Sequence, residues 1–93
     1  MDESSSDWKP FFVNWPDKVP QRGLLVTSFG EQIPFDGFMT GEAHLLLKRQ
    51  TPDSLGARMV ILPYEKVSAL KITDVLRSKA LQSFGFQGPS GSK

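Results

Sequence analysis

The sequence predicts an all-β domain: a five-stranded, strongly bent antiparallel barrel with a short aromatic N-terminal extension and a C-terminal amphipathic helix. The chain has 93 residues, which suits one domain. Leu, Ile, Val and Phe account for 26 of them, above the fraction of about 20% below which chains tend to be disordered. The apolar stretches are short and are separated by brief turns. These turns leave no room for the crossover helices of a parallel sheet.

The N-terminal part predicts a tail followed by an aromatic segment. Residues 1–7 are acidic and serine-rich, so we expect a disordered tail. Within residues 8–22, four aromatic side chains recur at the spacing of one helix face, and three prolines exclude a long helix. A short helix and an irregular segment both fit this pattern. The aromatic side chains would pack internally or, in the other interpretation, anchor another protein: Trp8, Phe11, Phe12 and Trp15.

From residue 23 to residue 73 the pattern is typical of strands. The second strand is interrupted at Asp36-Gly37, which predicts a bulge or a sharp bend. The third strand is apolar on both faces, so we expect it at the centre of its sheet. Pro63 has no N–H to donate and is expected to end the fourth strand. The five expected strands are 24–29, 32–39, 43–49, 58–62 and 67–72.

The C-terminal part predicts a helix over 74–84. Leu76, Ala80 and Phe84 form an apolar stripe, and Gly85 follows where helices often close. Residues 85–93 are rich in glycine and serine and are expected to be flexible. Five short strands with a sharp bend close most easily as a small barrel of the SH3 or Sm type.

Two stretches carry a resemblance to a known family. The segment 62–72 has an apolar strand end, a tight turn and further apolar residues, and it resembles the second Sm motif. The stretch 26–47 is similar in layout to the first motif, so residues 24–72 resemble an Sm-like domain of the LSm and Hfq type. The resemblance implies a barrel that assembles through its edge strands. The family's RNA-binding Asp and Asn are absent from 40–44, and Pro63-Tyr64 replaces the usual Arg-Gly.

The charge distribution raises a second possibility. Residues 1–47 carry three basic and seven acidic side chains, whereas residues 48–93 carry eight basic and three acidic ones. This asymmetry is compatible with an ordinary solvated surface or with a face for nucleic acid. Basic side chains would contact phosphates and an aromatic ring would stack on a base. The candidate nucleic-acid-binding residues are Lys48, Arg49, Arg58, Tyr64 and Lys66.

No pattern indicates catalysis, so we expect neither an enzyme nor a cofactor or metal site. His44 is the only histidine, and Glu31, Asp36 and Glu42 lie where turn carboxylates are common. The chain has no cysteine, no secretory signal and no membrane span, which favours the cytoplasm. The sequence therefore predicts a non-enzymatic binding or assembly module whose partner is itself, as a homo-oligomer, or another protein. The alternative is binding of single-stranded RNA.

Overall fold

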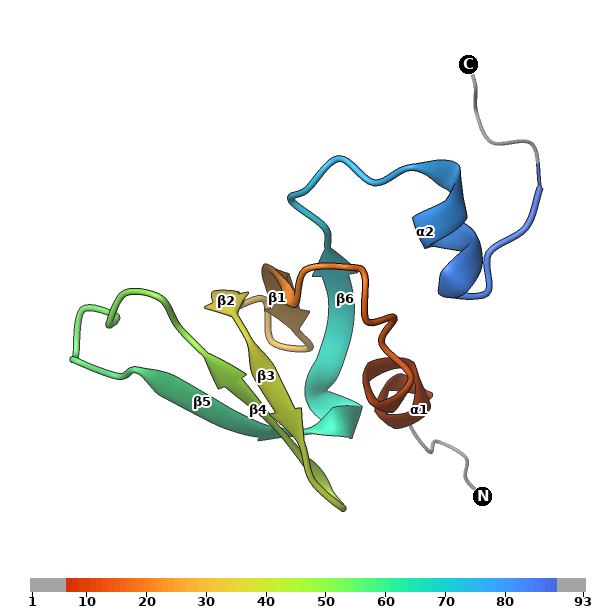
Figure 1. Cartoon of the computed structure of the whole chain (residues 1–93). Coiled ribbons are helices and arrows are strands. Elements are labelled where there is room, and N and C mark those ends of the chain that lie inside the picture. The colour runs from red at the N-terminus through yellow and green to blue at the C-terminus, as the bar shows by residue number, and fades with distance from the viewer. Residues whose placement is uncertain (1–6, 89–93) are drawn as a thin grey trace.

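The computed structural model describes residues 7–88 and shows a mostly β fold with two short helices (Figure 1). Within these residues, six strands form two three-stranded antiparallel sheets. The first sheet has the order β2-β1-β6 and the second the order β3-β4-β5. The strands are β1 Arg22–Thr27, β2 Gln32–Asp36, β3 Phe38–Thr40, β4 His44–Lys48, β5 Met59–Pro63 and β6 Val67–Lys71.

The strand count differs from the predicted five because the stretch expected as the second strand is two strands. Gly37 separates β2 from β3 with a φ of 121°, a value that side-chain-bearing residues rarely adopt. The Lys48 N–H donates to the Gly37 carbonyl at 2.9 Å, which holds the bend against β4. The predicted bend is confirmed, and it divides the strands between two sheets. In the part of the chain that the structure describes, these sheets do not join into a closed barrel.

The other predicted strands lie within two residues of the observed ones. Strand β4 is central in its sheet, as its apolar faces predict. Pro63 is the last residue of β5, and the chain then passes through a short 3-10 helix, η1 Tyr64–Lys66, into β6. The sequence predicted only a tight turn at η1.

The core lies between the inner faces of the two sheets. Leu25 and Ile33 of the first sheet and Leu45 and Leu47 of the second are almost completely buried. Helix α1 Trp8–Val13 contributes Phe12, whose ring lies edge-on to Phe38 at 5.0 Å between centroids. The short-helix interpretation of the aromatic segment is therefore confirmed.

The C-terminal helix is shorter than predicted. Helix α2 spans Ser78–Ser83, whereas residues 74–77 are not helical. The Asp74 carboxylate accepts two hydrogen bonds of 3.0 Å from the Arg22 guanidinium, so it does not cap a helix. Phe84, directly after α2, stacks on Phe11 with 5.1 Å between ring centroids. The helices α1 and α2 lie on one side of the molecule, and β5 lies on the other (Figure 1).

Candidate interaction surface

The outer face of the second sheet carries an apolar row that spans all three strands. Leu45 and Leu47 point into the core, so Leu46 between them points outward. The register places Leu46 opposite Met39 of β3 and opposite Ile61 of β5. Met39 is 57% exposed and Ile61 is 65% exposed, while Leu46 between them is partly covered. We call Met39, Leu46 and Ile61 the outer apolar row.

The neighbouring outward positions extend this row on one side and border it with polar groups. Met59 is 59% exposed and lies opposite Lys48 in the register. On the other side of the row, His44 lies opposite Pro63. An apolar strip with a polar border is the composition typical of a surface that binds protein. The uninterrupted apolar run from Met59 to Leu62 is the signal that sequence reasoning could have used.

The predicted nucleic-acid-binding residues do not form one group. Lys48 ends β4, and the Arg49 N–H donates to the Arg58 carbonyl at 2.8 Å, so these three residues lie at the same end of the β4–β5 hairpin. Lys66 ends η1, beyond the opposite end of β5. Strand β5 therefore separates Lys66 from the other three basic residues.

Tyr64 cannot act as the stacking platform that the sequence suggested. The side chain is only 5% exposed and belongs to the core. Its hydroxyl donates to the Gly41 carbonyl at 3.0 Å and so ties η1 to the turn after β3. A base would need an accessible ring face, and the fold uses that face for packing.

The four predicted interaction residues serve mainly the interior. Phe12 and Trp15 are buried, and the Trp15 indole N–H donates to the Val19 carbonyl at 3.0 Å. Trp8 and Phe11 are partly buried and pack against the core. They also line an apolar hollow of about 350 Å³ together with residues of β6 and of the α2 segment. A role of these residues in binding another protein stays a prediction.

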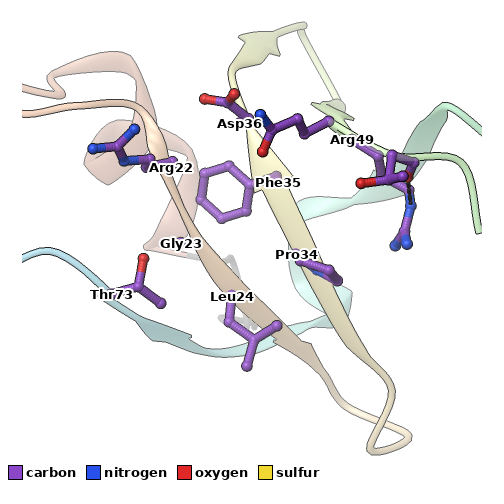
Figure 2. A pocket seen from close by; sticks show the side chains of 10 residues that line it. Arg22, Gly23, Leu24, Pro34, Phe35, Asp36, Arg49 and Thr73 are labelled. Atoms are coloured by element: carbon purple, nitrogen blue, oxygen red, sulfur yellow. Dashed lines mark hydrogen bonds between the residues drawn. The ribbon is translucent and has the colours of Figure 1, made fainter.

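A second hollow, of about 290 Å³, lies along β1 and β2 (Figure 2). Arg22 lies at its rim near Phe35 and Asp36, whereas Arg49 lies across β2 from them. The hydrogen bond and the charge of Asp74 raise the pKa of Arg22, and the hydrogen bond from Arg22 lowers the pKa of Asp74. The Arg49 Nε–H donates to the Thr51 carbonyl at 3.0 Å. The two guanidinium groups therefore do not converge on a common anion.

Two further acidic side chains, Asp53 and Glu42, have partners within the fold. The Asp53 carboxylate accepts hydrogen bonds from the N–H groups of Ala57 at 2.8 Å and Leu55 at 2.9 Å. These bonds, that of Ala57 first, lower the pKa of Asp53. Glu42 pairs with Lys9 at 3.5 Å between charged atoms. Among residues 7–88, no three His, Asp or Glu side chains are grouped as ligands for a metal ion.

Comparisons with known proteins identified no relative of this chain. No protein-family model, no curated protein and no solved structure matches this chain. Within residues 7–88, neither helix is long and apolar enough to cross a membrane.

Proposed function

We propose that this chain is a non-enzymatic binding and assembly module of the cytoplasm, built on an SH3/Sm-like barrel architecture, that associates through protein–protein contacts. The observation that carries the proposal is the outer apolar row. It places large apolar side chains on a three-stranded sheet with the two outer members, Met39 and Ile61, more than half exposed. Contiguous apolar surface of this kind typically marks an interaction site in a folded domain.

Two further observations support assembly. The sheet order leaves β5 with a strand on only one side, and an unpaired edge is a template for pairing with another chain. The bend at Gly37, which passes the chain from the first sheet to the second, supports the proposed bent-barrel architecture. The Sm-like resemblance of residues 24–72 implies assembly through edge strands as well.

Native mass over a range of protein concentrations tests this function. Light scattering on a size-exclusion column should give a mass above that of one chain, and the mass should rise with concentration. Ile61→Lys places a charge in the outer apolar row and should shift the chain toward monomer. The matched control is Leu55→Lys, which adds the same charge at a loop residue that is 93% exposed. A single-chain mass for the unmodified protein at every concentration would refute self-assembly.

A second candidate function is weak binding of single-stranded RNA. Lys48, Arg49 and Arg58 support it because they gather at one end of the β4–β5 hairpin. Contacts to phosphates release counterions, so the affinity for a labelled single-stranded RNA should fall steeply with salt. Replacing all three residues with glutamine should remove the salt dependence. Binding that persists in this variant would exclude the hairpin end as the RNA site.

A further inference from the structure

The main-chain groups on the open side of β5 follow from the hydrogen bonds of the second sheet. The Arg49 N–H donates to the Arg58 carbonyl at 2.8 Å, so these two residues form a hydrogen-bonded pair. Bonded and non-bonded pairs alternate along an antiparallel ladder. Val60 and Leu62 therefore bond to β4, whereas Met59, Ile61 and Pro63 direct their main-chain groups away from it.

The hydrogen bonds on the other side of β4 agree with this assignment. The Lys48 N–H donates to Gly37, and the Gly41 N–H donates to His44, both at 2.9 Å. Even-numbered residues of β4 thus bond to β3, and odd-numbered residues bond to β5. Among the described residues, no backbone group forms a hydrogen bond with the open side of β5.

We infer that the occupant of this edge is a second copy of the chain, whose β5 pairs antiparallel with the first about a two-fold axis at Ile61. This inference rests on the proposed assembly function and specifies its partner and geometry. Each Ile61 N–H would donate to the Ile61 carbonyl of the second copy. Each Met59 N–H would donate to the second copy's Pro63 carbonyl, a bond that Pro63 cannot return because it has no N–H.

Side chains support this register. Pairing at Ile61 joins the two outer apolar rows into one strip that runs across both sheets. Ile61, which is 65% exposed in one chain, thereby meets Ile61 of the second copy, and Met59, which is 59% exposed, meets the second copy's Pro63. The contact is self-complementary, as a two-fold interface must be.

Charge favours the antiparallel direction. In this register the end of β5 next to Arg58 lies beside the end of the second copy's β5 at Pro63, which continues into η1 with its acidic residue Glu65. A parallel pairing would instead place Arg58 beside Arg58, and the neighbouring Lys48 and Arg49 would add to the repulsion. Like charges placed opposite one another destabilise a strand pair.

Disulfide trapping tests the geometry, and the chain contains no cysteine that would interfere. In Ile61→Cys the two Cα atoms lie about 5.5 Å apart across the axis, within the range that a disulfide spans. The matched control is Met59→Cys, on the same strand and face and with similar exposure. Its two copies would lie about 14 Å apart, too far for a disulfide.

Under mild oxidation in native buffer, Ile61→Cys should form a covalent dimer at least about tenfold faster than Met59→Cys. In urea this difference should vanish. Equal native rates, or an Ile61→Cys that stays unlinked, would overturn the two-fold pairing.

The native mass of the unmodified chain distinguishes a failure of the two-fold pairing at Ile61 from a failure of self-assembly itself. A multimer whose Ile61→Cys form does not cross-link would refute the two-fold pairing but not assembly. A ring of five to seven chains would do the same, because a ring requires β5 to pair with a different edge of its neighbour. A single chain at all concentrations would refute both.

Discussion

Strands β2 and β5 are edges of the two sheets, and their central residues differ in one decisive way. The Thr27 N–H donates to the Glu31 carbonyl at 2.9 Å, so alternation turns the main chain of Pro34 away from β1. Pro34 has no N–H, and the middle of the β2 edge offers no donor. Ile61 has the same position in β5, and its N–H is available. Of these two edge strands, β2 is closed in its middle by a proline, whereas β5 is open there.

The outer face of the second sheet is also more apolar than the outer face of the first sheet. On the first sheet Leu24 lies between Lys71 and Pro34, so its cross-strand neighbours are a charged residue and a proline. On the second sheet Leu46 lies between Met39 and Ile61, both apolar. Both central strands place a leucine on the outer face. The neighbouring residues on the flanking strands therefore determine which outer face is apolar. The comparison teaches that association should depend on β5 and not on β2.

The largest expected effect comes from the interior that the two sheets share. Leu47→Ala removes a side chain with no exposed surface and should lower the free energy of unfolding by about 2–5 kcal/mol. Leu46→Ala, one residue away on the outer face, should cost about 1 kcal/mol or less. Urea unfolding followed by tryptophan fluorescence measures both values. Similar losses for the two variants would contradict the inner and outer assignment.

Proline at adjacent positions of β5 tests the edge directly. Val60→Pro removes an N–H that bonds to β4 and should destabilise the fold by about 2 kcal/mol or more. Ile61→Pro copies the arrangement at Pro34, so it should cost about 1 kcal/mol or less while weakening self-association. Urea unfolding and light scattering report the two quantities. If both substitutions cost the same, the N–H of Ile61 does not face the open edge.

Restoring a donor to the β2 edge should make the two edges more alike. Pro34→Thr supplies the missing N–H and should change the free energy of unfolding by less than about 1 kcal/mol. In an Ile61→Pro background it should restore some self-association, now through β2. Light scattering of the double variant against Ile61→Pro alone is the measurement. A double variant that stays monomeric would mean that Pro34 is not what closes β2.

The smallest expected effect is on acid stability. The hydrogen bond from Arg22 lowers the pKa of Asp74 in the fold, so this carboxylate stabilises the protein above its unfolded pKa of about 3.9. The contribution is lost as the pH falls through the folded pKa. Asp74→Asn should therefore show a smaller loss of unfolding free energy between neutral and acidic pH.

Asp53→Asn tests the same kind of acid dependence in the loop between β4 and β5 of the second sheet. Backbone N–H groups, that of Ala57 first, lower the pKa of Asp53, so this variant should remove a separate part of the acid dependence. Urea midpoints across the acidic range would reveal both contributions. A profile for Asp74→Asn that superimposes on that of the unmodified chain would contradict the role assigned to the Arg22 pair.

Local patterns predicted most of the fold. Alternation and apolar runs located the strands, and Asp36-Gly37 marked the bend because glycine tolerates a positive φ. The aromatic spacing allowed a short helix or an irregular segment, and the structure shows the short helix α1. The strand count was wrong because the bend creates two strands from one apolar pattern.

Features set by distant residues could not be predicted. Asp74 looked like a helix start, but its partner Arg22 is 52 positions away. Tyr64 looked available for stacking, but its hydroxyl bonds to Gly41, 23 positions away. The outer apolar row depends on the cross-strand register, which the sequence does not specify by itself. The apolar run from Met59 to Leu62 is visible in the sequence, but its alignment with Met39 and Leu46 emerged only with the structure.

The position of β1 has a consequence for the order in which the chain folds during synthesis. Strand β1 lies between β2, the next strand to emerge from the ribosome, and β6, the last. All strands of the second sheet have been synthesised once residue 63 is added. Leu24 of β1 can pair with its partner in β6, Lys71, only after that residue has been synthesised. Non-local pairings of this kind form late. On the nascent chain, β1 is therefore an unpaired edge in its own right until β6 has emerged.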